Sequence, residues 1–313
     1  MAGDVEVLIA HHNNLPKLRR CLDALATQTV PVGVCVIDDA STDQSPQAIE
    51  AEYPHVRYLR LERNEGFSRA NNHGIRSTQA AWVILLNNDT VPEPDFAERL
   101  LAARERTATR AVAACLRRMD GSVDSLGIEI DRSLIASDIG HGESYDAART
   151  VTPLAPCAGA GLYETALLRE LGGFDEALWA YLEDVELGVR MAMAGVRCAG
   201  APDAVAWHDH SASFGSGTAF KNRRMGDSRG HLCWKYGCDL TTAEKARGWL
   251  IDGVVYAGQI AIDRNAGALR GRAEGWRRRR GAARPAAHPE FARVPRAEVP
   301  IRAALARRLG RRR

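Results

Sequence analysis

The 313-residue sequence lacks the two glycine-rich signatures that most often announce a nucleotide-binding enzyme. The first expected strand is not followed by G-x-G-x-x-G, which argues against a dinucleotide-dependent oxidoreductase. No G-x-x-x-x-G-K-[ST] is present, which argues against a P-loop enzyme. No internal repeat is evident, so neither a solenoid nor a propeller is expected.

The sequence also has little that would place it across a membrane or outside the cell. No apolar run approaches the roughly 20 residues that a transmembrane helix needs. The N-terminal stretch contains Asp4 and Glu6 and shows no cleavage site, so we expect no signal peptide. Seven cysteines are scattered without a C-x-x-C pair, which is typical of reduced thiols in a cytosol. These features together predict a cytoplasmic protein.

The charge is unevenly distributed along a chain that is otherwise typical of a globular protein, with 45% apolar residues. Residues 270–313 contain 15 arginines and three glutamates, a balance of +12, so residues 1–269 carry −9 of the total of +3. A basic tail on an acidic body indicates an anionic partner, either lipid head groups or nucleic acid. A merely solvated arginine-rich tail is the alternative.

Apolar runs that stop at polar turn residues alternate with amphipathic segments along the first hundred residues. This order predicts an α/β fold with a mostly parallel central sheet and helices on both faces. Later elements include an antiparallel stretch at 122–135, a loop at 136–152, and two short strands at 196–199 and 204–207. The expected early strands are 5–10, 32–37, 56–61 and 82–86, and the expected helices include 67–77, 96–106 and 164–171.

Acidic residues stand where two of the expected strands end. Asp38 and Asp39 follow the second strand, and Asp89 follows the fourth, after Asn87 and Asn88. The carboxyl ends of parallel strands share one edge of the sheet, so these carboxylates are expected to meet in one crevice. Such an edge can hold a divalent cation on a diphosphate, although an ordinary Asn/Asp turn explains the same residues.

A second acidic group opens the helix expected after residue 182. Glu183 and Asp184 stand in its first turn, where the helix dipole alone favours carboxylates; alternatively, one of them faces the crevice as a general base. The strand at 204–207 ends at His208-Asp209-His210. A histidine beside an acidic crevice is a candidate metal ligand, although a strand-end histidine is often structural.

Four segments in this order resemble the family-two inverting glycosyltransferases with the GT-A fold, closest to the bacterial rhamnosyl- and galactofuranosyl-transferase branch. The resemblance covers residues from about 4 to 240. The segments are VIDDASTDQS at 36–45, NEGFSRANNHGI at 64–75, LLNNDTVPEPDF at 85–96, and the stretch from GGFDEALWAYLEDVELG to AVAWHDH within 172–210. A glycoside hydrolase, which the Glu183–Asp184 pair also suggests, would leave Asp38, Asp39 and Asp89 unexplained.

The resemblance implies a role for each matching residue. Asp184 would deprotonate the acceptor hydroxyl, with Glu183 beside it. Asp89 and His208 would coordinate Mg²⁺ or Mn²⁺ on the donor diphosphate; His210 is the alternative histidine. Asp38 would accept from the nucleotide base, and Asp39 would lie near the ribose or diphosphate. The remaining donor-site residues would be His12, Asn13, Arg69, Asn71, Asn87 and Asn88, and Trp179 and Tyr181 would stack on acceptor sugars.

Two departures from the family pattern concern the donor site. The metal loop has one carboxylate, Asp89, where many relatives have two, and His12 stands where relatives usually have tyrosine. The departures keep open a catalytically degenerate protein that binds a nucleotide sugar. The resemblance itself implies transfer of a sugar, with dTDP-rhamnose or a UDP-sugar favoured as donor, to a glycan, a polyprenyl-linked glycan or a glycosylated small molecule.

The C-terminal part is expected to be organised differently from the catalytic domain. We predict a GT-A domain at 1–240, an amphipathic helical extension at 241–269 and a partly disordered arginine-rich tail at 270–313. The helix at 243–262 either packs on the domain or lies on a membrane. The tail suits the anionic inner face of the plasma membrane. Nucleic acid is a weaker partner, because aromatic residues are not interleaved with the tail's arginines.

Overall fold

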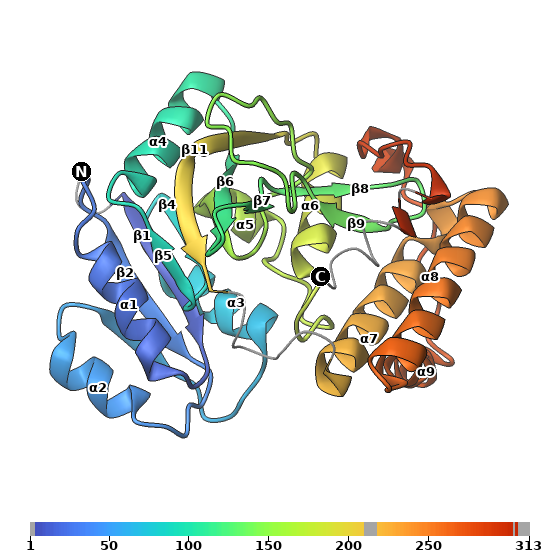
Figure 1. Cartoon of the computed structure of the whole chain (residues 1–313), viewed down its shortest axis with the longest axis horizontal. Coiled ribbons are helices and arrows are strands. Elements are labelled where there is room, and N and C mark those ends of the chain that lie inside the picture. The colour runs from blue at the N-terminus through green and yellow to red at the C-terminus, as the bar shows by residue number, and fades with distance from the viewer. Residues whose placement is uncertain (1–3, 210–217, 303, 306–313) are drawn as a thin grey trace.

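A computed structural model describes residues 4–209, 218–302 and 304–305. Figure 1 shows a sheet flanked by helices, with a separate layer of C-terminal helices on the right. The N-terminal elements are β1 (Val5–His11), α1 (Leu15–Leu25), β2 (Gly33–Asp38), α2 (Ser45–Glu52), β3 (Arg57–Arg60), α3 (Phe67–Ser77), β4 (Trp82–Leu86), β5 (Thr90–Pro92), α4 (Phe96–Thr107) and β6 (Ala111–Arg118).

The second half of the chain completes the sheet and adds the helical layer. Two short 3₁₀ helices lie at Gly237–Asp239 and Pro289–Arg293. The other elements are β7 (Val123–Ser125), β8 (Ile128–Ile130), β9 (Ala136–Asp138), β10 (Ala160–Glu164), α5 (Thr165–Glu170), α6 (Glu183–Met193), β11 (Cys198–His208), α7 (Ala219–Lys235), α8 (Thr242–Ile262) and α9 (Gly267–Arg279).

The central sheet of the described chain has nine strands, in the order β3-β2-β1-β4-β10-β6-β11-β5, with β7 beside β6. Strands β1 to β4, β6 and β11 run in one direction, so the expected mostly parallel sheet is confirmed. The parallel pairing brings His11, at the end of β1, level with Asp38, at the end of β2. The early strand ends therefore share one edge, as predicted.

Three details of the C-terminal half of the sheet differ from the sequence prediction. The two short strands expected at 196–199 and 204–207 are one strand, β11, whose register shifts between Ala201 and Val205. The shift inserts extra residues while both halves stay paired with β6. The segment expected as a loop from residue 136 begins with β9, and the proline-containing turn after Asp89 forms β5 against β11.

The alternation of side chains along the strands builds a core on each face of the sheet. Val7 and Ile9 of β1 lie on one face, with Leu100 of α4. Leu8, between them, lies on the other face with Ile75 of α3 and Met191 of α6. Because successive strand side chains point to opposite faces, both faces are covered and the sheet is held as a rigid base for its carboxyl edge.

Helices α7, α8 and α9 form a layer beside the sheet domain, with α7 and α9 in very close contact. A Cβ atom on Gly226 of α7 would lie 2.0 Å from the carbonyl oxygen of Ala268. One on Gly271 of α9 would lie 1.8 Å from the carbonyl oxygen of Arg223. Glycine is therefore required for this approach. Helix α9 extends into the segment for which partial disorder was predicted. Within the described residues, no helix is both long and apolar enough to cross a membrane.

Candidate active site

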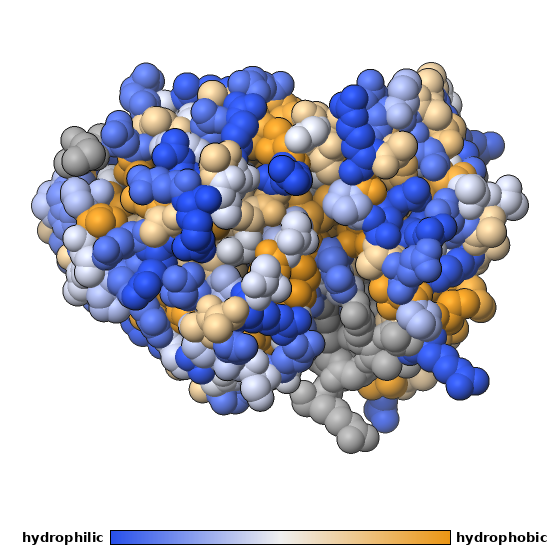
Figure 2. Space-filling model, turned by 90° about the horizontal axis from the view of Figure 1, so that it is seen from above, coloured by the Kyte–Doolittle hydropathy of each residue, from blue (hydrophilic) through white to orange (hydrophobic). Residues whose placement is uncertain are grey.

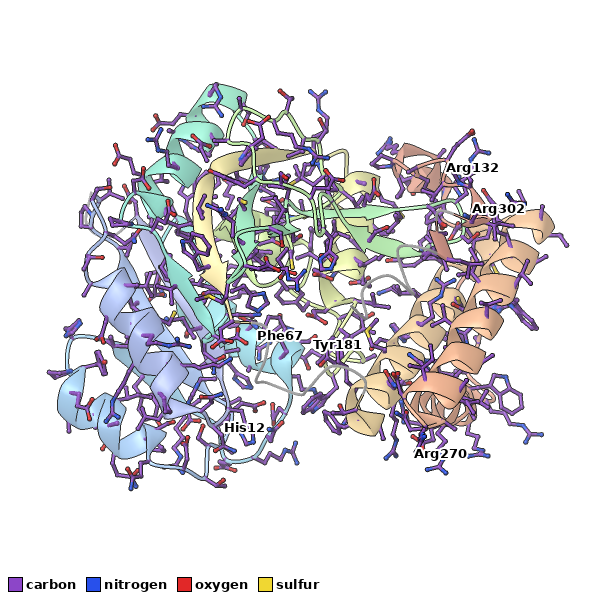
Figure 3. All side chains as sticks on the ribbon, in the orientation of Figure 1. His12, Phe67, Arg132, Tyr181, Arg270 and Arg302 are labelled. Carbon is purple, nitrogen blue, oxygen red and sulfur yellow. The ribbon has the colours of Figure 1, made fainter. Side chains whose placement is uncertain are left out.

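One pocket of about 1870 Å³ joins the carboxyl edge of the sheet to the helical layer. The space-filling view shows the molecule hollowed between the sheet domain and the helices (Figure 2). Phe67 and Tyr181, which line the pocket, lie toward this boundary in Figure 3, and His12, which also lines it, lies further into the sheet domain. The pocket therefore receives side chains from strand ends on one side and from α6, α7 and α8 on the other.

Asp39 and His12 form the end of the pocket at β1 and β2. Both oxygens of Asp39 accept backbone N–H groups, from Glu65 at 2.6 Å and from Gly66 at 2.8 Å. Burial raises the pKa of Asp39 and outweighs these bonds. His12 bonds through Nδ1 to the carbonyl oxygen of Asp39 at 2.8 Å. The pair ties the end of β2 to the start of α3.

Asp38 is fully buried behind this end and does not line the pocket. Tyr58 donates its hydroxyl to Asp38 Oδ2 at 2.6 Å, and the backbone N–H of Ser41 donates to Oδ1 at 2.8 Å. Asn13 does line the pocket, and its side-chain oxygen accepts from the backbone N–H of Thr42 at 2.8 Å. The side chains of Asp38 and Asn13 thus shape the loop after β2.

Two residues predicted for the donor site lie away from the pocket. Arg69 is 3.5 Å from Glu176 in an exposed ion pair. Asn71 is buried and donates to the carbonyl oxygen of Phe67, one turn earlier in α3. The neighbouring residues Asn64, Gly66 and Phe67 line the pocket instead. The structure therefore brings the start of this motif to the site, but not Arg69 or Asn71.

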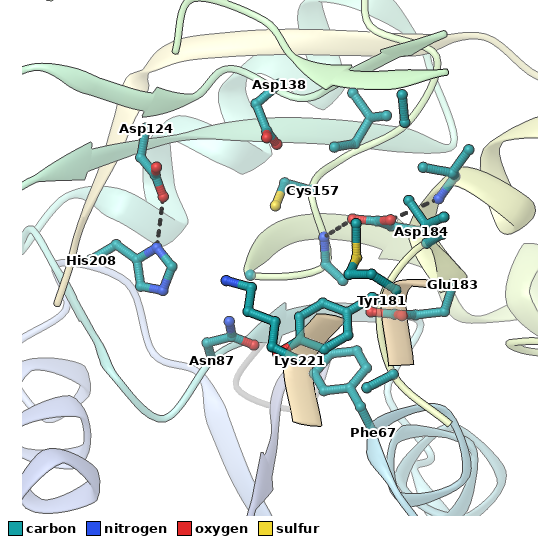
Figure 4. A pocket seen from close by; sticks show the side chains of 18 of the residues that line it. Phe67, Asn87, Asp124, Asp138, Cys157, Tyr181, Glu183, Asp184, His208 and Lys221 are labelled. Carbon is teal, nitrogen blue, oxygen red and sulfur yellow. Dashed lines mark hydrogen bonds and ion pairs between the residues drawn. The ribbon is translucent and has the colours of Figure 1, made fainter. Parts of the chain in front are cut away.

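Asp89 and His208 lie side by side in the pocket, brought together by the antiparallel pairing of β5 with β11. His208 Nε2 is 3.3 Å from Asp89 Oδ1, and Nδ1 is 2.7 Å from Asp124 Oδ2 (Figure 4). Burial lowers the pKa of His208, but the two carboxylates outweigh burial and raise it to about 9. A cation held here would displace the Nε2 proton, as metal ligation requires.

The two asparagines before Asp89 have different surroundings. Asn88 donates through Nδ2 to His11 Nδ1 at 2.7 Å. Burial lowers the pKa of His11 to about 4, so His11 is a neutral acceptor. The side chain of Asn87 faces the pocket in Figure 4, and its backbone N–H bonds to Gly159. Both asparagines line the pocket, and their role in donor binding stays a prediction.

Glu183 and Asp184 begin α6 and line the pocket on the side away from β1. Backbone N–H groups of Ala158 and Val185 donate to the two oxygens of Asp184 at 3.1 and 2.8 Å. Glu183 is buried, and its Oε2 has no hydrogen-bond partner in the described structure. Desolvation raises the pKa of both carboxyls, and the charge of Asp184 raises that of Glu183 further.

The third acid of this helix, Glu186, has a structural role. It is fully buried and accepts bonds from Arg190, Lys235 and Tyr236. These bonds join α6 to α7 and hold the pKa of Glu186 below its usual range despite burial. Only Glu183 and Asp184 are therefore turned to the pocket.

Trp179 and Tyr181, the predicted sugar-stacking residues, both line the pocket. Trp179 lies against Gly66, where an added Cβ would come within 2.5 Å of the indole ring. Tyr181 has a φ of 69° and Leu182 of 64°, a left-handed turn that non-glycine residues rarely adopt. The turn presents the Tyr181 ring to the pocket two residues before Glu183.

Asp124 and Asp138, two acidic side chains in the pocket, were not predicted from the sequence. Asp124 and Asp138 stand in β7 and β9, three-residue strands without a clear alternating pattern. Lys221 reaches the pocket from α7, with Nζ 5.7 Å from the centre of the Tyr181 ring. The sequence predicts that the basic segment containing Lys221 and Arg229 faces a phosphorylated acceptor, and both residues line the pocket. His210 lies outside the described residues.

Comparison with known proteins assigns the chain to a family. The sequence profile described as Glycosyl transferase family 2 matches residues 6–159. A Mycobacterium tuberculosis protein named N-acetylglucosaminyl-diphospho-decaprenol L-rhamnosyltransferase is 30% identical over 244 residues, which span 69% of this chain and 79% of the relative. The chain belongs to glycosyl transferase family 2. The predicted family is confirmed, and the matched region includes both the Asp39 and the Asp89 ends of the pocket.

A second relative agrees with membership of family 2, and solved structures share the fold. The pre-mycofactocin glycosyltransferase of M. tuberculosis is 28% identical over 210 residues, 66% of this chain and 43% of that protein. The fold resembles the mannosyltransferase PcManGT of Pyrobaculum calidifontis, solved with GDP-Man and Mn²⁺, with a TM-score of 0.55, 19% identity, and coverage of 92% of this chain and 77% of that one.

GalNAc-T7, solved with UDP, GalNAc and Mn²⁺, matches with a TM-score of 0.60 and 15% identity over 87% of this chain. The match spans 54% of the GalNAc-T7 chain, about half of the length of GalNAc-T7. These likenesses confirm the predicted GT-A fold.

Proposed function

We propose that the chain is an inverting, metal-dependent glycosyltransferase that moves a sugar from a nucleotide-diphosphate donor to a glycan, a polyprenyl-linked glycan or a glycosylated small molecule. One observation carries the proposal. The Asp89–His208 pair and the Glu183–Asp184 pair line the same pocket from different elements of the fold. Inverting transfer needs charge neutralisation at the leaving diphosphate and a base at the acceptor, and these two pairs supply both.

The nucleotide of the donor would lie at the Asp39 end of the pocket. Asp39 and His12 present polar groups there, whereas Asp38 supports the loop from behind through Tyr58 and Ser41. We therefore assign direct recognition to Asp39 and His12. The similarity to a rhamnosyltransferase favours dTDP-rhamnose as the donor. Because structures of similar fold were solved with UDP or GDP-Man, other nucleotide sugars are candidate donors as well.

Asp89 and His208 are the residues that would hold Mg²⁺ or Mn²⁺. Their ligand atoms lie 3.3 Å apart, and Asp124 fixes the outer nitrogen of His208, an arrangement common to metal-bound histidines. Within the described residues no group of three or more His, Cys, Asp or Glu side chains is placed to hold a metal. The other ligands would then be diphosphate oxygens and water, as is usual for Mg²⁺. The ion would neutralise charge on the leaving diphosphate.

Asp184 is the proposed general base for the acceptor hydroxyl. The two backbone N–H groups that donate hydrogen bonds to Asp184 stabilise its ionised form and fix its orientation. Glu183, whose Oε2 has no such donor, holds its proton more tightly. Asp184 would therefore take the proton while Glu183 stays neutral beside it. Trp179 and Tyr181 offer aromatic faces to the acceptor sugar.

A nucleotide-sugar-binding protein without transferase activity is the second candidate. Asn87 and Asn88 put two neutral amides where a second metal-binding carboxylate would strengthen the site. Such a protein would bind a nucleotide sugar but would not release nucleotide from it. Turnover separates the two candidates directly.

We expect one member of a panel of nucleotide sugars to be hydrolysed slowly when Mg²⁺ or Mn²⁺ is present, because water can replace the acceptor in an activated site. The panel should contain dTDP-rhamnose, UDP-sugars and GDP-mannose, and released nucleotide should be measured with and without chelator. The donor that is turned over should also raise the thermal unfolding midpoint. Binding without release under every condition would support the degenerate protein, and no thermal shift with any donor would contradict the donor site.

Asp124→Asn should weaken the metal site without removing a ligand. The amide cannot hold the His208 imidazole as a carboxylate does, and loss of such outer partners typically costs about 10- to 100-fold in metal affinity. The measurement is the Mn²⁺ concentration that gives half-maximal nucleotide release. Activity should recover at high Mn²⁺. A lower maximal rate with an unchanged Mn²⁺ dependence would contradict this positioning role.

A further inference from the structure

Helix α8 has an inverted arrangement of polar and apolar side chains. Its polar residues face the protein: Arg247 donates to Asp131 and to the carbonyl oxygen of Val299, each at 2.5 Å. Asp252 accepts from the buried Arg229 at 3.2 Å. These bonds fix the rotation of the helix about its axis. The face that remains for solvent is therefore the apolar one.

The outward face of α8 is apolar along almost its full length. Trp249 is 73% exposed, Leu250 55% and Ile260 47%. The exposed positions recur at helical spacing from Ala246 to Ala261, about 22 Å along the axis. Seven of the ten large exposed hydrophobic residues in the described chain lie on α8, α9 or the turn between them: Trp249, Leu250, Val254, Ile260, Ile262, Leu269 and Trp276.

Arginine is the only charged residue that is well exposed around this apolar face. In residues 242–280, all of them described, the other well-exposed positions are apolar, small or Thr242, and none is acidic. The four acidic side chains of the stretch are partly buried and bonded within the protein: Glu244, Asp252, Asp263 and Glu274. The well-exposed arginines are Arg264, Arg270, Arg277, Arg278 and Arg280.

We propose that the outer face of α8 and α9, with Trp249, Leu250, Ile260, Trp276 and the flanking arginines, docks the enzyme on the surface of a bilayer that contains anionic lipid. An apolar stripe with tryptophan sinks into the boundary between head groups and acyl chains. Arginines beside it meet the negative surface potential. The helix lies along the membrane and does not cross it.

The charge of the face decides between a bilayer and a second copy of the chain. A symmetric dimer through α8 would bring five exposed arginines of each copy toward those of the other. Arg278 is paired with Asp227 of α7, but no exposed acid in 242–280 offsets the other four. Like charges at an interface are unfavourable. An anionic lipid surface instead complements every charge on the face, so the same residues favour a membrane.

The proposed surface and the pocket lie on opposite sides of α8. Ile251 and Val255, on the inner side of α8, line the pocket, while Leu250 and Val254 are on the outer side. Figure 3 shows Arg270 and Arg302 near opposite ends of the helical layer. Docking here would hold the pocket close to the bilayer, where a lipid-linked acceptor is found. The docking itself does not depend on the proposed transferase activity.

The test is sedimentation of the full-length protein with two kinds of vesicle, phosphatidylcholine alone and phosphatidylcholine mixed with phosphatidylglycerol. We expect binding to the mixed vesicles that weakens as salt is raised. Trp249→Ser with Leu250→Ser should reduce the partition coefficient at least about tenfold. Arg277→Glu should reduce it about fivefold or more, whereas the matched variant Arg106→Glu, on exposed α4, should change it little.

Brominated acyl chains give an independent readout, because they should quench wild-type tryptophan fluorescence and quench Trp249→Phe less. Wild-type protein that stays in solution with both vesicles would overturn the proposal, as would equal binding of the Trp249/Leu250 double variant. The face would instead be assigned to a second copy of the chain if two results were found together. The wild type would form a dimer in sedimentation but not bind vesicles, and the double variant would no longer form the dimer. Asp184→Asn should bind vesicles like wild type, so loss of transfer and loss of docking are distinguishable.

Discussion

Asp184→Asn is expected to reduce the rate of sugar transfer by about 10²- to 10⁴-fold, the usual contribution of a positioned general base. The amide keeps the size of the side chain and an oxygen that can accept from Ala158 or Val185, but it cannot take a proton. Donor binding involves the other end of the pocket and should be unchanged. The measurements are kcat under saturating donor and acceptor, and the donor Kd by calorimetry.

Glu183→Gln is the matched control, because both variants remove one carboxylate from the same turn of α6. A glutamine resembles the protonated Glu183 that we infer, so this variant should keep activity within about tenfold of wild type. The opposite pattern, with Glu183→Gln inactive and Asp184→Asn active, would exchange the two roles. Equal, severe loss in both would mean that the pair acts as one unit.

The acidic side of the pH profile should report the same base. Asp184 must be ionised to accept a proton, and burial raises its pKa above that of an exposed carboxyl. The value of kcat should therefore fall as the pH drops through this raised pKa, at a higher pH than the ordinary value of about 4 predicts. Stopped assays across the pH range, at saturating metal, would show the limb. A kcat that stays unchanged down to pH 4 would contradict the assignment.

Asp89→Ala should abolish metal-dependent nucleotide release, with a loss of about 10²-fold or more, because it removes the only carboxylate from the loop 87–89. Adding chelator to the wild type should have the same effect, and Mn²⁺ or Mg²⁺ should restore the wild type but not the variant. Calorimetric titration of Mn²⁺ in the presence of nucleoside diphosphate measures the binding step separately from catalysis.

The matched control for Asp89→Ala is Asp23→Ala, which removes an exposed carboxylate on α1 outside the pocket lining. It should leave metal binding and nucleotide release at wild-type levels. Asn87→Asp offers the converse test, because a second carboxylate in the loop should strengthen Mn²⁺ binding. Unaltered Mn²⁺ binding in Asp89→Ala would sink the assignment of this residue as a ligand.

The fold was largely predictable because its signals are local. Each early strand is an apolar run that ends at a polar turn, so the edge that collects His12, Asp39 and Asp89 could be placed from the sequence alone. Strand β11 could not, because Pro202 and Asp203 interrupt its apolar pattern. The strand continues because the register shift accommodates them while both halves stay paired with β6.

The site was predicted less completely, because several of its contacts depend on tertiary packing. Asp38 and Asp39 are adjacent in sequence, yet only the packing of Tyr58 against Asp38 decides which of them reaches the pocket. Asp124 meets His208 across 84 residues of chain. No short pattern marks such a partner. Lys221 enters the pocket only because α7 packs beside α6, through Glu186, Lys235 and Tyr236.

The glycine contacts between α7 and α9 have a mechanical consequence. With no Cβ at Gly226 or Gly271, the two backbones lie so close that a rotation or shift of either helix alone would produce a clash. Helix α7 supplies one wall of the pocket through Lys221, Met225 and Arg229. A displacement of α9 would therefore be passed through α7 to that wall of the pocket.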